Sequence, residues 1–185
     1  MILNRQTKKC VSQALRRFPT LSVLMFSACI TPGYNQTVQH VQLEKFMGQW
    51  YVIAGRFTFL EAGAHNAVET YSYNKEKNQI DISFTFNKDS LEGEQKSIPQ
   101  TGWIHNASSN AHWKVSPIWP LKFDYLVLDV AEDYSWTAVG VPNQNYLWIM
   151  SRSKNIPRPQ VLTIKEKIAT GNIDTVVHAK ARDDL

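Results

Sequence analysis

The feature that most constrains the fold of this chain is a run of short strand-like segments, which begins near residue 49 and ends near residue 152. In the clearest segment, residues 79–86, isoleucine or phenylalanine occupies every second position and polar residues lie between them. Turn-forming residues separate the segments, for example at residues 74–78 and 106–110. The pattern predicts an all-β domain, either a sandwich or an up-and-down barrel. The other expected strands are residues 49–56, 67–73, 94–105, 111–115, 125–130, 134–141 and 146–152.

One helix is expected, late in the chain. Prolines stand at its start, an apolar stripe follows over residues 161–168, and Gly171 provides a C-terminal stop. A short last strand at residues 173–179 comes next. Two of the earlier strands, at residues 125–128 and 146–150, are apolar on both faces. We therefore expect one face of each to line an interior and the other to lie beneath the helix.

The N-terminal segment is predicted to be a lipoprotein signal peptide. Residues 1–28 carry five basic side chains and no acidic one, and their last 11 residues are mostly apolar but too few to span a bilayer. The small residues before Cys29 resemble a bacterial lipobox, in which the cysteine thiol receives a diacylglyceryl group. We expect an acylated Cys29, a lipidated N-terminus and tether at residues 29–42, and a domain at residues 43–185. The alternative is a conventional signal peptide that leaves Cys29 as a free thiol.

The distribution of charge argues against one class of partner. The whole chain carries 20 lysine and arginine residues against 16 aspartate and glutamate residues, a net charge of +4. Five of the basic residues and none of the acidic ones lie in residues 1–28, so the remainder has 15 against 16, a net charge of −1. A nucleic-acid-binding domain needs a basic surface, and this balance gives no support for one.

Motifs of catalysis and metal binding are not found in the sequence. The five histidines show no ligand spacing with a third ligand beside them. No nucleophile elbow surrounds a serine, and no phosphate-binding glycine loop is present. If Cys29 is acylated, the mature chain also lacks a cysteine nucleophile. We therefore expect no metal, no cofactor and no enzymatic activity.

Three motifs occur in order along the chain. Gly48-Gln-Trp50 opens the first strand, Phe123-Asp124-Tyr125 lies in the middle, and Tyr146-Leu-Trp-Ile-Met-Ser-Arg152 closes the last long strand. Over residues 43–180 the chain resembles the lipocalins, and in particular the bacterial outer-membrane lipoprotein lipocalins related to apolipoprotein D. The resemblance implies an eight-stranded antiparallel up-and-down barrel, with one C-terminal α-helix packed outside it and a short last strand.

The resemblance also implies structural roles for the motif residues, among which are Asp124 and Tyr125. Gly48 allows a tight turn into the barrel. Trp50 fills the closed end with a large apolar body. Arg152 lays its guanidinium over that indole, a cation–π contact of about 1 kcal/mol or more. Trp50 and Arg152 are expected to hold the barrel shut and not to touch a ligand.

An eight-stranded barrel is wide enough to hold one small ligand, or only its own side chains. Strand alternation places aromatic side chains and small alanines inside, which predicts an apolar cavity for an elongated ligand. Arg56 is expected near the mouth, where it pairs with a carboxylate or phosphate. Plain core packing is the alternative for each aromatic residue. The expected ligand-binding residues are Val52, Ala54, Arg56, Phe84, Phe86, Trp113, Val115, Trp136, Ala138, Tyr146, Trp148 and Met150.

The resulting hypothesis is a lipid-binding protein that stores or transports a fatty acid, such as palmitate, or a lysophospholipid. The resemblance connects this role to membrane maintenance under stress, to an outer-membrane location in the bacterial envelope, and to a possible homodimer. Two alternatives remain open: a filled barrel that presents loops to a protein partner, and a lipocalin-fold enzyme. Trp119, flanked by prolines, is expected either to touch lipid at the mouth or to cover the barrel end.

Overall fold

The structure is a computed structural model that describes Tyr34 and residues 36–168, 174–176 and 178. The expected signal peptide and Cys29 lie outside the described residues. In the described part of the chain, no helix has the length and apolar character needed to cross a bilayer. The elements in chain order are α1 (Leu43–Phe46), β1 (Gly48–Arg56), the 3₁₀ turn η1 (Phe59–Glu61), β2 (Ala64–Asn74), β3 (Gln79–Lys88), β4 (Gln95–Ile104), β5 (His112–Ser116), β6 (Phe123–Val130), β7 (Trp136–Gly140), β8 (Leu147–Ser151), α2 (Arg158–Ile168) and β9 (Asp174–Thr175).

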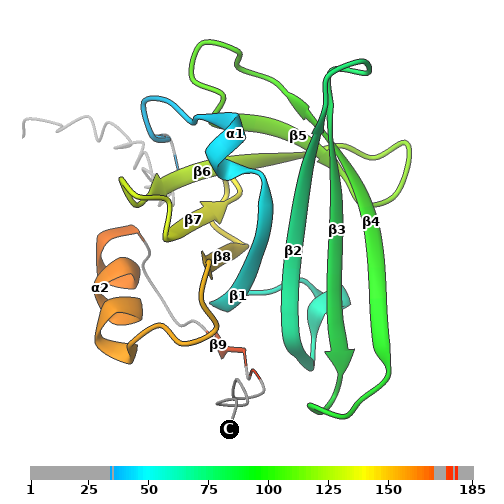
Figure 1. The fold of residues 1–185 in the computed structure, drawn as a ribbon, viewed down its shortest axis with the longest axis vertical. Helices are drawn as coiled ribbons and strands as arrows, with labels where there is room; N and C mark the ends of the chain where they lie inside the picture. The colour runs from blue at the N-terminus through cyan, green and yellow to red at the C-terminus, as the bar shows by residue number, and fades with distance from the viewer. Residues whose placement is uncertain (1–33, 35, 169–173, 177, 179–185) are drawn as a thin grey trace, which may run out of the picture. The chain divides into compact units, whose positions relative to one another are not determined.

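The strands form one closed antiparallel barrel (Figure 1). Strands β2 to β8 are neighbours in sequence order, β1 pairs with β8, and β1 also pairs with β2, which closes the ring. The expected eight-stranded up-and-down barrel is therefore confirmed. The expected short last strand is present as β9, which pairs with Ala54 and Gly55 of β1.

Strand β1 changes partners along its length. Its first half, residues 48–51, pairs with β2, whereas residues 51–56 pair with β8. A β-bulge interrupts the pairing with β8 between Val52 and Ala54. A bulge adds one residue to a strand, so the side chains beyond it exchange faces. Trp50 and Val52 therefore belong to the cluster inside the barrel, and Ala54 belongs to the cluster outside it.

The outer cluster lies between the barrel and α2, which covers β7 and β8 (Figure 1). Val161 and Ile164 of α2 are buried against Ile53, Leu147 and Ile149. The apolar stripe of the expected helix is thus the face that packs on the barrel. The outward-facing apolar residues of β8 lie beneath this helix, as their pattern predicts.

Aromatic packing seals the barrel end beside α1. Trp50 and Phe46 are fully buried with ring centres 5.3 Å apart, and the Trp50 indole N–H donates a hydrogen bond of 2.8 Å to the Phe46 carbonyl. The Arg152 guanidinium carbon lies 3.6 Å from the centre of the Trp50 ring. Gly48 has a φ of +94°, and a Cβ there would lie 3.5 Å from Arg152 Nη1. The expected contact between Arg152 and Trp50 is therefore present, and Gly48 has a backbone conformation that favours glycine.

The residues just before α1 also pack on the barrel. Val41 is fully buried in the inner cluster, and Val38 packs against that cluster. Their backbone N–H groups donate hydrogen bonds to the carbonyls of Ser109, at 2.7 Å, and Val127, at 3.0 Å. The last residues of the expected tether therefore belong to the folded domain, since their backbone groups are paired with it.

Candidate functional site

A cavity of about 570 Å³ is lined by η1, by the loops after β5 and β7 and by residues of the neighbouring strands. This volume is within the range of about 300–1,000 Å³ that is usual for small-molecule sites. Its wall is mainly apolar. The apolar and aromatic residues that line it are Phe59, Leu60, Phe84, Ile98, Val115, Pro117, Ile118, Leu121, Phe123, Tyr125, Val141, Pro142, Tyr146 and Trp148. The polar ones are Thr58, Glu61, Glu69, Gln100, Lys122, Asp124 and Asn143.

A buried carboxyl group, that of Glu69 on β2, lies in the deep part of the cavity beside the aromatic seal. Tyr71 donates a hydrogen bond to Glu69 Oε2, and Tyr125 is in turn hydrogen-bonded to the Tyr71 hydroxyl. Trp113 stacks on Tyr125, with ring centres 5.4 Å apart. Burial raises the pKa of Glu69 to about 7, the hydrogen bond from Tyr71 opposes that rise, and the nearby charge of Glu61 adds to it.

Glu61, the last residue of η1, is the second buried carboxyl group. Its Oε2 accepts hydrogen bonds from the Thr58 backbone N–H at 2.7 Å, which is one of the two bonds of a capping box, and from the Thr58 hydroxyl at 2.8 Å. Its Oε1 accepts a hydrogen bond of 2.7 Å from the indole N–H of Trp148. Burial raises the pKa of Glu61, although these hydrogen bonds oppose the effect.

The mouth of the cavity is apolar and exposed. Phe59, Ile118, Leu121 and Phe123 are each more than half exposed, although large apolar side chains are usually buried. Trp119 is 73% exposed and is not among the residues that line the cavity, so it does not cover the barrel end. The rim of the cavity is therefore a surface on which an apolar ligand or partner can lie.

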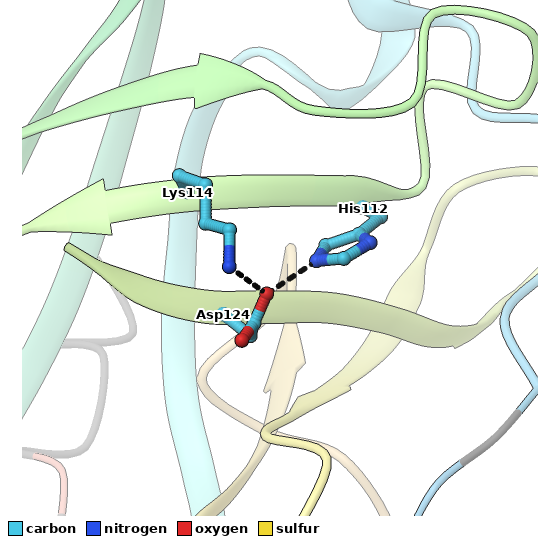
Figure 2. Close-up of polar contacts among 3 residues, drawn as sticks. All are labelled: His112, Lys114 and Asp124. Carbon is cyan, nitrogen blue, oxygen red and sulfur yellow. Dashed lines mark hydrogen bonds and ion pairs between the residues drawn. The ribbon is translucent and has the colours of Figure 1, made fainter.

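Asp124 stands at the same mouth and is held by two neighbours, a histidine and a lysine. Figure 2 shows His112 Nε2 and Lys114 Nζ, both on β5, each 2.6 Å from Asp124 Oδ1. Burial opposes ionisation of Asp124, but the hydrogen bonds and charges of Lys114 and His112 lower its pKa overall. Asp124 thus ties β5 to β6. Within the described residues, no three histidine, cysteine or acidic side chains are grouped to hold a metal ion.

The structure brings four of the twelve expected ligand-binding residues to the cavity wall. They are Phe84, Val115, Tyr146 and Trp148. Another four face the barrel interior but are packed in the inner core and do not line the cavity. These are Val52, Phe86, Trp113 and Met150.

The other four expected positions are corrected. Ala54, Ala138 and Trp136 pack in the outer cluster beneath α2, because the bulge reverses the end of β1 and because β7 presents Val139 rather than its neighbours to the interior. Arg56 lies beyond the same bulge and does not line the cavity. Its guanidinium donates hydrogen bonds to the Gln144 carbonyl, at 2.8 Å from Nη2, and to the Tyr34 hydroxyl, at 3.1 Å.

The two buried carboxyl groups were not predicted from the sequence. Glu69 shares the inner face of β2 with Ala67 and Tyr71, all three of which are buried. An acidic residue at an inward-facing position of a strand was therefore the available signal. Glu61 carried only a weaker signal, the spacing of three residues from Thr58 that is typical of a capping box.

Comparison with known proteins finds matches over most of the chain. The family described as "Lipocalin-like domain" matches residues 41–179. The outer membrane lipoprotein Blc of Vibrio cholerae is 25% identical over 143 residues, which cover 76% of this chain and 82% of that protein. Temperature-induced lipocalin-1 of Arabidopsis thaliana is 27% identical over 148 residues, 75% of this chain and 77% of that protein. Blc of Escherichia coli K12 is 28% identical over 134 residues, 72% and 75% of the two chains.

Solved structures share the same fold at lower sequence identity. Insecticyanin from the tobacco hornworm Manduca sexta has a TM-score of 0.58 and 17% identity, and the match covers 80% of this chain and 88% of that one. Lobster apocrustacyanin A1 has a TM-score of 0.57 and 15% identity, over 74% and 79% of the two chains. At these identities the likeness concerns the barrel and not the ligand.

Proposed function

Because the chain belongs to the lipocalin-like family, whose members are generally binding or transport proteins, we propose that it binds a single-chain lipid, a fatty acid or a lysophospholipid, inside its barrel. The observation that carries this proposal is the cavity of about 570 Å³ with a mainly apolar wall and an apolar mouth. Transfer of an alkyl chain from water to such a wall is favourable by about 0.8 kcal/mol for each buried methylene group.

The residues that we assign to ligand contact are those on the cavity wall. Phe84, Val115, Tyr146 and Trp148 come from the sequence-based prediction, and Ile98 and Leu121 are added because they line the same space. These six side chains present apolar or aromatic surface from four strands and from the loops after β5 and β7. Selectivity then depends on the few polar groups among them.

We further propose that the protein is held at the bacterial outer membrane through an acylated Cys29, with residues 1–28 removed and with the barrel, including the packed residues Val38 and Val41, as the binding domain. The relatives from Vibrio cholerae and Escherichia coli carry the name outer membrane lipoprotein, which supports an envelope location. A role in membrane maintenance under stress is the corresponding hypothesis for the cell.

The two alternative functions have less support. A filled-barrel scaffold requires an interior packed with side chains, and the open cavity argues against it. A lipocalin-fold enzyme has no particular observation in its favour. We therefore retain lipid binding as the one proposed function.

The proposal is tested by native mass spectrometry of the purified protein, followed by lipid extraction and calorimetric titration of the delipidated protein with single-chain lipids. Ile98 is the residue at which the cavity is most simply filled, because it points inward from the middle of β4. We expect Ile98→Trp to abolish binding. The matched control is Ser97→Trp, whose position is the exposed neighbour on the same strand.

Binding that survives Ile98→Trp but is lost in Ser97→Trp would place the lipid outside the barrel. A delipidated protein that binds no single-chain lipid would contradict the proposal altogether.

A further inference from the structure

The cavity holds two buried carboxyl groups without a buried cation to balance them. Glu61 is 7% exposed and Glu69 is 5% exposed, and both line the cavity. Among the described lining residues, the one basic side chain is that of Lys122, which is exposed at the mouth. Its ammonium group lies 4.0 Å from the centre of the Trp103 ring. Burial of unbalanced carboxyl groups is costly, so their presence on a cavity wall needs a cause.

The hydrogen bonds of the two carboxyl groups are unequal. Both oxygens of Glu61 accept hydrogen bonds, from Trp148 and Thr58. Glu69 accepts one at Oε2 from Tyr71, and no residue that the structure describes bonds to its Oε1. A side chain that is more than nine-tenths buried thus presents an unpartnered acceptor in a cavity that has room for a ligand.

Aromatic rings stand beside these acids on the same wall. Trp148 lies between Tyr125 and Tyr146, with ring centres 6.3 Å and 6.2 Å away, and all three rings line the cavity. Aromatic faces attract cations through the ring quadrupole, most strongly where water is excluded. A carboxyl group beside two or more aromatic faces favours an organic ammonium ion, because the acid and the ring faces both attract the cation.

We propose that this cavity selects an ammonium-bearing amphiphile, which enters with its cationic group inward, against Glu69 and Glu61, and leaves its alkyl chain toward the mouth. This inference rests on the proposed function, because it names the chemical class of the lipid that the same cavity takes. The exposed apolar rim of Phe59, Ile118, Leu121 and Phe123 provides the surface on which the outer end of the chain lies.

The opposite orientation and the opposite charge fit these contacts less well. An alkyl chain that entered first would place its terminal methyl group against the unpartnered oxygen of Glu69 and leave that oxygen unsatisfied. A carboxylate that entered first would meet Glu61 and Glu69, both acids, without a cation nearby. A zwitterionic single-chain lipid satisfies the site through its amine.

The test uses three probes with the same alkyl chain and different head groups: dodecyltrimethylammonium, dodecanoate and dodecanol. The two ionic probes are titrated below their micelle concentrations, and dodecanol below its solubility limit, into the delipidated full-length protein, and binding is followed by calorimetry. We expect the ammonium probe to bind at least about tenfold more tightly than dodecanoate, a difference near 1.4 kcal/mol. In the NMR spectrum of the complex, we expect nuclear Overhauser contacts between the N-methyl protons and the indole of Trp148.

Two variants isolate the carboxyl groups. Glu69→Gln and, independently, Glu61→Gln are each expected to weaken the ammonium probe by about tenfold and to leave dodecanol binding within about twofold. The control is Glu166→Gln, which removes an exposed acid on α2, on the far side of the barrel wall, and is expected to change neither.

The outcomes separate the inference from the function that it rests on. If dodecanoate binds as tightly as the ammonium probe in the wild-type protein, or if the N-methyl protons contact mouth residues instead of Trp148, the inference is overturned while lipid binding stands. If none of the three probes binds, the proposed function fails. The wild-type comparison needs no substitution, so it decides the matter even if a glutamine variant does not fold.

Discussion

At the scale of single residues, Arg152 is the clearest case of one side chain that holds several parts of the molecule together. Its Nη2 donates hydrogen bonds to the carbonyls of Lys45, Phe46 and Met47 at 2.7–3.0 Å, and its Nη1 donates to Gln49 at 2.6 Å. These acceptors are the carbonyl groups at the end of α1 and the start of β1. One guanidinium therefore donates hydrogen bonds to the otherwise unpaired carbonyl groups at the C-terminus of a one-turn helix, and it also stacks on Trp50.

Arg152→Ala is expected to lower the free energy of unfolding by about 3 kcal/mol, because it removes charge-assisted hydrogen bonds and a cation–π contact together. Chemical denaturation measures the loss. Arg152→Lys is expected to recover little of it, since an ammonium cannot form the planar set of bonds. The matched control is Arg158→Ala, an exposed arginine at the start of α2, and an equal loss there would contradict this account.

Glu69 gives stability a pH dependence whose sign can be worked out. Its ordinary pKa is 4.5, and burial raises it to about 7 in the folded protein. Between these two pH values, the folded state keeps a proton that the unfolded chain has released. The free energy of unfolding therefore decreases as the pH rises from about 4.5 to about 7.

Compared with Glu69→Gln, the wild-type protein is expected to lose on the order of 3 kcal/mol of stability across that range, because each pH unit of difference is worth about 1.4 kcal/mol. Chemical denaturation at a series of pH values measures both proteins. The difference between the two profiles removes the contributions of Glu61, whose pKa is also raised, and of His178, whose pKa is lowered by burial. Parallel profiles would show that Glu69 does not titrate in this range.

At the scale of elements, strand β1 shows what sequence alternation can and cannot predict. Residues 51–55 are apolar or small at every position, so the sequence does not indicate which of them face the interior of the barrel. The bulge between Val52 and Ala54 depends on the pairing with β8, a strand about a hundred residues later. In β8 the alternation holds, and Trp148 and Met150 face inward as expected. Prediction fails where the register depends on a distant partner.

The helix α2 packs on the barrel and does not line the cavity, so its contribution to stability should be separable from binding. Ile164 is 3% exposed and Leu162 is 45% exposed, on the same helix. Ile164→Ala is expected to cost about 2–4 kcal/mol, and Leu162→Ala about 0.5 kcal/mol, in chemical denaturation. Both variants should bind a lipid probe as the wild-type protein does at temperatures where they remain folded. Weaker binding by a folded Ile164→Ala variant would contradict the separation.

At the scale of the whole molecule, the barrel and its outer helix could be predicted because many short patterns agree with one fold. Regular strands and turn residues predict a sandwich or a barrel, and the three ordered motifs, through their resemblance to the lipocalins, select the barrel. The cavity could be predicted only in part, since the wall combines residues from six strands with loops whose positions no local pattern fixes. The exposed mouth formed by Phe59, Ile118 and Phe123 is one such surface.

The short strand β9 has a consequence for how the protein behaves at high concentration. β2 leaves β1 after Tyr51, and β9 pairs with Ala54 and Gly55, so it occupies the side of β1 that β2 has vacated. The pairing continues beyond β9, where Val176 donates to the carbonyl of Ile53 at 2.9 Å. Without these residues, β1 would present an open edge, and open edges recruit strands from other molecules.

Deletion of residues 174–185 is therefore expected to produce a protein that folds but aggregates, with light scattering that grows with concentration while the full-length chain stays constant. A chain that ends at Val176 keeps the pairing with β1 and should scatter no more than the full-length chain. The two-residue strand β9 would then prevent edge-to-edge polymerisation.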